Sequence, residues 1–496
     1  MSEQYILSID QGTSSSRAIL FNHNQDILGI EQKEIKVYYP QKAWVEQDPE
    51  EILETTYHAV LKLLNKLHIS SQNIAAIGIT NQRETTVIWD KNTGQAIHRA
   101  IVWQDSRTSV YCNEIKNSKI ASLIKKKTGL VVDSYFSATK IKWLLDKYDP
   151  ERIRAKKGEL LFGTIDTWLL WNLTEGKLHD TDYSNASRTM LFDIYKKEWS
   201  PELLDYFQIP KEILPQVKDT SQVYGYTNKN FSKYKIPIAS LVGDQQAALF
   251  GQRCTEPGMV KNTYGTGCFM LMNTGHKIVN SKQGLLSTIA WQINGETTYA
   301  LEGSVFVAGA VIQWLRDEMG LIKTAAESET MAMKVKDNNG VYFVPAFTGL
   351  GAPYWDGAAQ GAITGLSRDS NKYHIIRAAL ESTAFQTKDI LNSMMVDSKI
   401  ELKKIYVDGG AVENNFLMQF QADILDTEII RPENTESTAL GAALLAGMAV
   451  GFYSFEEIKQ NHRTDRIFKA SIKEDQREAA YAGWIRAVER LRTNKD

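Results

Sequence analysis

The sequence lacks the features that mark several special classes of protein. It has only three cysteines in 496 residues, Cys112, Cys254 and Cys268, and they stand far apart. This spacing argues against a disulfide framework or a zinc site and favours a reducing compartment. The chain also lacks a charge excess: 57 basic and 59 acidic residues give a net charge of −2, spread along its length. A nucleic-acid partner, which requires a clustered basic face, is therefore not expected.

A hydrophobic run long enough to cross a membrane is missing as well. The longest run, ALGAALLAGMAVGF at 439–452, is shorter than the roughly 20 residues of a membrane span and is rich in Ala and Gly. It predicts a tightly packed buried helix with Ser437 or Thr438 as its N-cap. The N-terminus has neither the charged nor the apolar region of a signal peptide. We therefore expect a cytoplasmic protein with no membrane span.

Apolar residues are plentiful, at 43%, and the length predicts two to four domains. Hairpin strands followed by a crossover helix indicate mixed sheets flanked by helices. In the helix that starts at DPEE, Asp48 can act as the cap and Glu51 stands at capping-box spacing. The predicted strands are 5–9, 17–21, 27–32, 74–80, 87–90, 340–344 and 404–407, and the later helices are 304–319, 372–395, 414–425 and 437–447.

The chain also contains a faint internal repeat. Residues 258–273 again predict a strand, a Gly-Thr turn and a strand, as residues 5–21 do. This pattern indicates two similar halves, with a boundary near 251–258. We expect an N-terminal domain at 1–250 and a C-terminal domain at 251–496.

The first Gly-Thr turn carries an unusual set of polar groups, in IDQGTSSSRA. Its glycine and hydroxyl residues present N–H and O–H donors together, which suits phosphate oxygens. Arg17 adds a charged fork for a terminal phosphate, and Asp10, at the end of a buried strand, suits hydrated Mg²⁺. The stretch is not a P-loop, because it has no GK[ST] and no helix follows. From this loop alone, an ordinary polar turn remains an equal alternative.

Two further stretches favour a nucleotide. TYGTGC at 263–268 is a second tip of the same kind, and VDGGAVENN at 407–415 ends a strand with glycines that allow a ligand close to the backbone. Taken alone, the latter is more simply an ordinary strand-to-helix turn. Three such tips from both halves of the chain imply a nucleotide in a cleft between two domains.

The remaining polar motifs suggest an acceptor with hydroxyl groups. NQRET places Arg83 and Glu84 side by side, so that donors and acceptors can meet vicinal hydroxyls, although a surface ion pair is the simpler interpretation without context. Trp103 can form an apolar wall for a small polyol, or it can be a core residue. In LVGDQQAALFGQ an apolar strand delivers Asp244, either as a general base for a hydroxyl or as a helix cap.

These stretches together resemble the FGGY family of carbohydrate and polyol kinases, over nearly the whole chain. Within that family the sequence is most similar to bacterial members that phosphorylate glycerol. The resemblance implies two actin-like (ribonuclease H-like) ATPase domains of α/β class with an interdomain cleft. The motifs that carry it are SIDQGTSSSRA, GITNQRETTVIWD, IVWQDSRT, FSATKIKWLLD, GDQQAALFGQ, NTYGTGCFML, FTGLGAPYWD and DGGAVENNFLMQFQADIL.

The resemblance also implies the reaction and its residues. ATP and Mg²⁺ would serve to phosphorylate glycerol to sn-glycerol 3-phosphate, with Asp244 as the base and Asp10 organising the metal. Family members are commonly dimers or tetramers, so self-association is implied too. The implied acceptor residues are Arg83, Glu84, Trp103, Tyr135, Asp244, Gln245 and Phe269, and the implied nucleotide residues are Thr13, Ser14, Ser15, Arg17, Thr266, Gly309, Gln313, Gly410 and Asn414.

Other functions remain open at this point. A kinase for another polyol or ketose would share the mechanism, but such relatives generally lack the Arg-Glu pair. An actin-like or chaperone-like ATPase switch would share the fold without needing an acceptor pocket. The chain also departs from related kinases in one loop, 227–239, which has Asn230 about where some of them carry a regulatory histidine.

Overall fold

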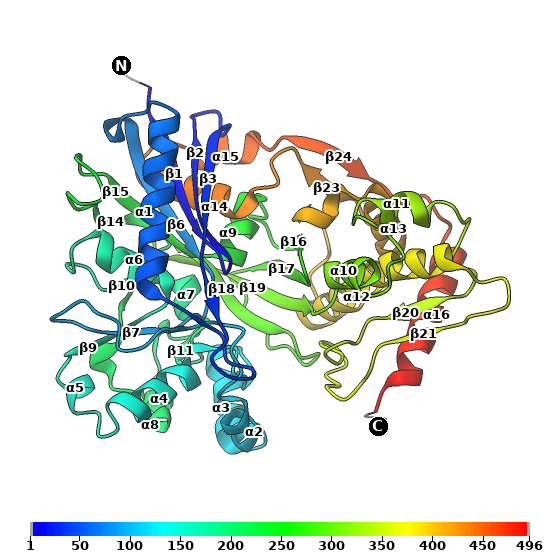
Figure 1. The fold of residues 1–496 in the computed structure, drawn as a ribbon, viewed down its shortest axis with the longest axis horizontal. Helices are drawn as coiled ribbons and strands as arrows, with labels where there is room; N and C mark the ends of the chain where they lie inside the picture. Colours follow the sequence, from blue (N-terminus) through cyan, green and yellow to red (C-terminus); the bar gives the residue numbers. More distant parts are fainter. Residues whose placement is uncertain (1–2, 494–496) are drawn as a thin grey trace.

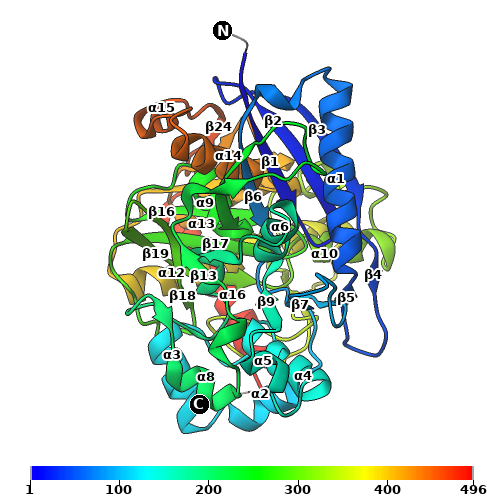
Figure 2. The ribbon, with the colours of Figure 1, turned by 90° about the vertical axis from the view of Figure 1, so that its left-hand side faces the viewer.

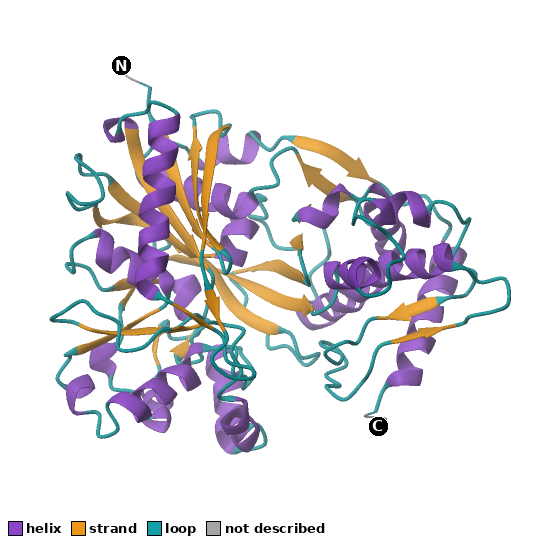
Figure 3. Ribbon diagram, viewed as in Figure 1, coloured by secondary structure: helices purple, strands orange, loops and turns teal. Residues whose placement is uncertain are grey.

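Two large mixed sheets form the centre of the protein, as seen in a computed structural model that describes residues 3–493 (Figure 1). The first sheet has the strand order β14-β15-β6-β1-β2-β3, and the second has the order β18-β19-β17-β16-β22-β23-β24. Colouring by secondary structure shows the two sheets with helices packed around them (Figure 3). The strands of the first sheet are β1 (Tyr5–Gln11), β2 (Ser15–Phe21), β3 (Ile27–Glu34), β6 (Ile74–Asn81), β14 (Ser221–Tyr226) and β15 (Pro237–Gly243). Those of the second are β16 (Met259–Tyr264), β17 (Cys268–Gly275), β18 (Leu286–Ile293), β19 (Glu296–Val305), β22 (Lys404–Asp408), β23 (Ile429–Pro432) and β24 (Thr464–Phe468).

Helices cover these two sheets. The short strands pair with one another in small separate sheets of two or three strands. In Figure 2 α1 runs along the outer face of the first sheet. The helices are α1 (Pro49–Lys66), α2 (Ser109–Ile115), α3 (Lys119–Thr128), α4 (Ser137–Tyr148), α5 (Ile153–Lys156), α6 (Ile165–Leu173), α7 (Tyr183–Ala186), α8 (Pro201–Phe207), α9 (Asp244–Gly251), α10 (Gly309–Asp317), α11 (Glu327–Ala332), α12 (Lys372–Ser398), α13 (Asn415–Leu425), α14 (Ser437–Ala449), α15 (Phe455–Gln460) and α16 (Glu474–Leu491). The short strands are β4 (Val37–Tyr38), β5 (Glu46–Gln47), β7 (Val87–Asp90), β8 (Ala100–Ile101), β9 (Leu160–Gly163), β10 (Asp180–Asp182), β11 (Phe192–Asp193), β12 (Glu198–Trp199), β13 (Gln216–Lys218), β20 (Tyr342–Val344) and β21 (Ala362–Thr364).

The repeat suggested by the two Gly-Thr turns is present in the topology. In the first sheet β1 pairs antiparallel with β2 and parallel with β6. In the second sheet β16 pairs antiparallel with β17 and parallel with β22. The outer strands repeat too, because β15 and β23 continue the parallel part while β14 and β24 close it antiparallel. Each half therefore has its own sheet of this topology, and the Gly-Thr turn occupies the equivalent hairpin in each sheet.

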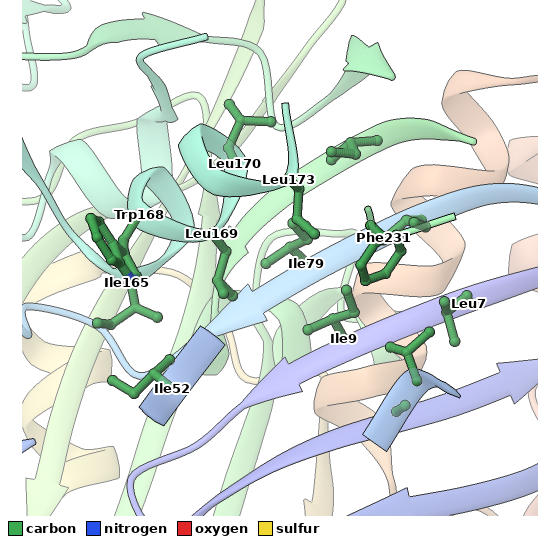
Figure 4. Packing of buried hydrophobic residues seen from close by; sticks show 14 of the residues in the cluster. Leu7, Ile9, Ile52, Ile79, Ile165, Trp168, Leu169, Leu170, Leu173 and Phe231 are labelled. Atoms are coloured by element: carbon green, nitrogen blue, oxygen red, sulfur yellow. The ribbon is translucent and has the colours of Figure 1, made fainter. Parts of the chain in front are cut away.

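An apolar core fixes the first sheet under α1 and α6 (Figure 4). Ile52 of α1 and Leu169 of α6 are fully buried and pack in one cluster with Ile9 and Ile79 of the central strands. Burial of side chains of this size contributes about 1.5–3 kcal/mol each. This packing holds rigid the strands whose carboxyl ends carry the polar motifs.

The apolar run near the C-terminus forms the buried helix that the sequence predicts. α14 and α9 share a core cluster with residues of both sheets, including Ile19 of β2 and Leu271 of β17. The two helices approach very closely: a Cβ on Gly441 would lie 1.9 Å from the carbonyl oxygen of Ala247. Only glycine fits such a contact. Within residues 3–493 no helix combines the length and apolar character of a membrane span.

Several local predictions were wrong at the ends of elements. Asp48 caps α1 by accepting from the Glu50 amide, but Glu51 accepts from the Lys36 amide (3.0 Å) instead of closing a capping box. The N-cap of α14 is Glu436 rather than Ser437 or Thr438, because the Ser437 hydroxyl accepts from Gln252 (2.7 Å).

The helix predicted from residue 304 begins later. Ser304 and Val305 still belong to β19, where they pair with Phe269 and Cys268, and α10 starts at Gly309. The strand predicted at 340–344 begins at Tyr342, because Gly340 has a φ of 72° and turns the chain. Local propensity gave way in both places to strand pairing and turn geometry.

Candidate active site

The two Gly-Thr turns, which the sequence predicts to bind phosphate, form tight hairpin tips. In the first, the Gly12 amide donates to the Ser15 carbonyl (3.0 Å), which closes a tight turn between β1 and β2. In the second, the Gly265 amide donates to the Gly267 carbonyl (2.8 Å). Thr13, Ser14 and Ser15 stay at least partly exposed at the first tip, whereas Ser16 is buried against Thr55 (2.9 Å). The exposed members therefore remain free to donate to a ligand.

A cavity of about 430 Å³ opens beside the second tip. The start of α10 is fastened to this tip, since the Gly309 amide donates to the Gly265 carbonyl (3.0 Å). The cavity has apolar walls from Ile312, Leu380 and Ala411, which suit a flat aromatic base. It brings together five predicted nucleotide residues from three separate elements: Thr266, Gly309, Gln313, Gly410 and Asn414.

Asp10 and Arg17 face each other across the β1–β2 hairpin. Their side chains lie 3.4 Å apart, and the other side of Arg17 forms an ion pair with Glu436, which immediately precedes α14. Burial raises the pKa of Asp10 to about 6, although Arg17 acts to lower it. Glu436 was not identified from the sequence, because it lies in a loop more than 400 positions after its partner Arg17.

The predicted acceptor residues form one cluster next to the first tip. Trp103 packs edge-on against Tyr135 at 5.6 Å and against Phe269 at 6.5 Å between ring centroids. The indole N–H of Trp103 donates to the Thr13 hydroxyl (2.9 Å), which connects this aromatic wall to the phosphate tip. The Arg83 guanidinium donates to the Tyr135 hydroxyl (3.3 Å). Residues from both halves of the chain thus lie together in this cluster.

Asp244 occupies the first position of α9, directly after β15. Gly243 is the N-cap, so the alternative of Asp244 as the cap is wrong. Its carboxylate is 31% exposed, accepts from the Gln245 amide (2.7 Å) and lies 3.1 Å from Arg83 Nε. The surrounding protein raises the pKa of Asp244 by desolvation, against the effect of Arg83. A partly exposed carboxylate of raised pKa is a suitable proton acceptor.

Glu84 and Gln245 are both held in place by neighbouring groups. Glu84 has a φ of 62°, a conformation that few residues other than glycine adopt. The hydroxyls of Thr86 and Ser137 donate to its carbonyl oxygen and hold this conformation (3.0 and 3.1 Å). The side-chain carbonyl of Gln245 accepts from Lys261, so its amide N–H₂ remains available to a ligand.

Sequence reasoning missed Glu302 and Arg188, which are buried behind Arg83 and Glu84. The signal was present, because Glu302 interrupts the apolar alternation of β19 and a charge in a buried strand requires a partner. The partners of Glu302 could not be identified from the sequence, because Arg83 lies 219 positions and Arg188 lies 114 positions away from it.

Comparisons with known proteins find one family across both halves of the chain. Residues 5–251 match the N-terminal domain, and residues 260–450 the C-terminal domain, of the FGGY family of carbohydrate kinases. A protein of Carboxydothermus hydrogenoformans named glycerol kinase is 58% identical over 99% of both chains. One of the same name from Caldanaerobacter subterraneus subsp. tengcongensis is 58% identical over 98% of both.

A solved structure extends the comparison to three dimensions. The crystal structure of Plasmodium falciparum glycerol kinase with ADP superposes with a TM-score of 0.94 at 36% identity, covering 99% of each chain. The family resemblance and the two-domain, actin-like fold predicted from the sequence are therefore confirmed.

Proposed function

The chain belongs to the FGGY family of carbohydrate kinases, and on that premise we propose that it transfers the γ-phosphoryl group of ATP to glycerol. The products are sn-glycerol 3-phosphate and ADP. The observation that carries the proposal is the junction at Arg83, whose Nε lies 3.1 Å from Asp244 within the aromatic cluster that Trp103 connects to Thr13. The residues proposed to bind the polyol, to act as the base and to bind phosphate are linked there by direct contacts. The names of the bacterial and Plasmodium relatives support glycerol as the acceptor.

In this mechanism the acceptor pocket orients one primary hydroxyl toward the nucleotide. Arg83, Glu84, Tyr135 and Gln245 hydrogen-bond the glycerol hydroxyls, while Trp103 and Phe269 cover its carbon atoms. Asp244 accepts the proton of the attacking hydroxyl as the new O–P bond forms and the bond to the β-phosphate oxygen breaks. General base assistance of this kind contributes about 10²–10⁴-fold in rate. The proton then leaves through the exposed side of the carboxylate.

The nucleotide would lie between the two halves of the chain. Residues 1–250 supply the β1–β2 tip, and residues 251–496 supply the cavity for the base and ribose. Arg17 would exchange its ion pair with Glu436 for a phosphate oxygen, since both partners are anionic. The nucleotide residues in this proposal are Thr13, Ser14, Ser15, Arg17, Thr266, Gly309, Gln313, Gly410 and Asn414.

We propose Asp10 as the protein group that holds Mg²⁺. It is a buried carboxylate whose neighbour Arg17 lies 3.4 Å away, so oxygen lone pairs remain for a hydrated cation. No cluster of three or more His, Cys, Asp or Glu side chains occurs among residues 3–493 that could enclose a metal. This fits Mg²⁺, which is commonly held by one or two carboxylates with phosphate and water. When bound, it would neutralise charge on the β- and γ-phosphates.

The direct test is ADP release by the purified protein with Mg²⁺-ATP. It is measured without acceptor and with glycerol, dihydroxyacetone, erythritol or xylulose in turn. We expect strong stimulation by glycerol above the other acceptors. Equal turnover without any acceptor would contradict the proposal and indicate a nucleotide-driven switch. Stimulation by another polyol would retain the mechanism and overturn the substrate.

The raised pKa of Asp10 predicts the acid side of the pH profile. At pH values below about 6 a proton increasingly occupies this carboxyl and competes with the cation. Since kcat/KM reports groups of the free enzyme, kcat/KM for ATP should fall below about pH 6, approaching about tenfold per unit. Protonation of Asp244 acts in the same direction. A flat profile down to pH 5, with folding checked by circular dichroism, would contradict this assignment.

A further inference from the structure

Four charged side chains form a buried network behind the acceptor pocket. The carboxylate of Glu302 accepts from Arg83 Nη1 (2.6 Å) and Nη2 (3.3 Å), and from Arg188 Nη2 (2.8 Å). Arg188 Nε in turn donates to Glu84 Oε1 (2.6 Å). Two arginines and two glutamates therefore alternate along one chain of charge-assisted hydrogen bonds.

Glu302 and Arg188 are inaccessible to any substrate. The side chains of both residues are 0% exposed, so they can act on an acceptor only through Arg83, Glu84 and their neighbours. Burial acts to raise the pKa of Glu302, but Arg188 and Arg83 outweigh it and hold the pKa at about 2. Glu302 thus remains an anion at neutral pH, as its two guanidinium partners require.

The network joins the two halves of the molecule at the acceptor pocket. Glu302 lies on β19 of the second sheet, whereas Arg83 follows β6 of the first sheet. Arg188 follows α7 and packs 5.6 Å from the centre of the Tyr135 ring. Arg188 therefore contacts both Glu84 and Tyr135, while Glu302 accepts hydrogen bonds from Arg83. Three predicted acceptor-binding residues therefore share two fully buried supports.

The grip of Glu302 also sets the direction of Arg83. Both terminal nitrogens of its guanidinium donate to Glu302. Nη1 also donates to the side-chain carbonyl of Gln246 (3.2 Å), Nη2 also donates to Tyr135, and Nε lies beside Asp244. Without that grip, the only carboxylates next to Arg83 are those of Asp244 and of Glu84, at 3.1 and 3.8 Å, among the described residues. Nη1 of Arg83 would then keep its hydrogen bond to Gln246, while the guanidinium as a whole would shift toward Asp244 and Glu84.

We propose that Glu302, together with Arg188, is a positioning residue that aims Arg83 and Glu84 at the hydroxyls of the acceptor. The inference rests on the proposed function, since it assigns a role to residues behind the acceptor site. It gives β19 of the second sheet a part in the orientation of the groups that hydrogen-bond the polyol. A displacement of about 1 Å in a positioning group can cost roughly 10²-fold in rate.

The test compares Glu302→Gln with the unchanged full-length protein in steady-state kinetics. The substitution keeps the size of the side chain and removes its charge. We expect the KM for glycerol to rise by about tenfold or more, while the KM for ATP stays within about twofold. A purely structural role would lower thermal stability without separating these two constants.

Glu381→Gln is the matched control. Glu381 is also buried and forms an ion pair with Arg377 (2.7 Å), but both residues lie on α12 and neither contacts the acceptor cluster. We expect it to lower the melting temperature and leave the KM for glycerol unchanged. If Glu302→Gln is destabilised but retains the unchanged protein's KM for glycerol, the proposal is overturned.

Arg188→Lys provides a second route should Glu302→Gln fail to fold. Lysine keeps the positive charge but cannot span Glu84 and Glu302 with two directed nitrogens. The KM for glycerol should again rise more than the KM for ATP, and equal changes in both would overturn the proposal. Failure of the proposed function would appear separately, as absence of glycerol stimulation in the unchanged protein. The kinetics would then be compared with whichever acceptor that protein uses.

Discussion

Asp244→Asn is expected to reduce kcat by about 10²–10⁴-fold while the KM for glycerol changes only a few-fold. The amide has nearly the same shape as the carboxylate and can still accept from the Gln245 amide, which lies 2.7 Å away. It cannot take the proton of the attacking hydroxyl. Removal of an interaction that matters only in the transition state lowers kcat and kcat/KM together. Initial rates at saturating ATP and varied glycerol measure both constants.

A control for this substitution must remove a carboxylate from the first turn of another helix. Asp475→Asn does so, because Asp475 lies in the first turn of α16 and is exposed. It reports the cost of losing a negative charge near a helix N-terminus, about 0.3–1 kcal/mol. If Asp244→Asn retained the kcat of the unchanged protein, Asp244 would not be the base. Melting temperatures of both variants would show that the loss is chemical rather than structural.

Much of the fold follows from local sequence pattern. Two apolar runs separated by a glycine and hydroxyl residues specify the β1–β2 hairpin, and a second such pair specifies β16–β17. The predictions failed where a longer-range partner decided the outcome. Ser304 has the surroundings of a helix start, but pairing with Phe269 keeps it in β19. Ser437 has the chemistry of a cap, but its hydroxyl binds Gln252 instead.

The site divides in the same way. Thr266 and Gly410 each lie in a glycine-containing motif with its own local chemistry, and both line the cavity. Gly309 was implied only by the family resemblance, and it lines the same cavity. Glu302 and Glu436 were missed because their function depends on partners distant in the sequence. A single buried glutamate in a strand indicates that it has a partner, but the sequence does not show which of the many arginines is that partner. Only the assembled sheets identify Arg83 and Arg17.

Gly441→Ala is expected to lower both stability and activity, against the usual direction of this substitution. In a helix, alanine is favoured over glycine by about 1 kcal/mol. Here the added Cβ would lie 1.9 Å from the Ala247 carbonyl oxygen and 2.6 Å from its carbonyl carbon. These are backbone atoms of α9, so no side chain can move aside. Overpacking of this kind costs about 1–3 kcal/mol, occasionally more, and outweighs the gain in propensity.

The effect on activity follows from what the two helices carry. α9 begins at Asp244, one turn before Ala247, and α14 is preceded by Glu436, the partner of Arg17. A helix displaced at residue 247 therefore moves the base relative to the phosphate tip. We expect a lower melting temperature and a kcat reduced by about tenfold or more even at temperatures where the variant is fully folded.

Gly357→Ala is the appropriate comparison, because its added Cβ would meet no atom within 4 Å. That variant should match the unchanged protein in melting temperature and kcat. Unfolding followed by circular dichroism, together with ADP release well below the transition, separates the two effects. An unchanged melting temperature for Gly441→Ala would mean that α9 and α14 can move apart without loss of stability, and it would contradict the prediction. A lower melting temperature with normal kcat would mean instead that their packing stabilises the protein without setting the position of Asp244.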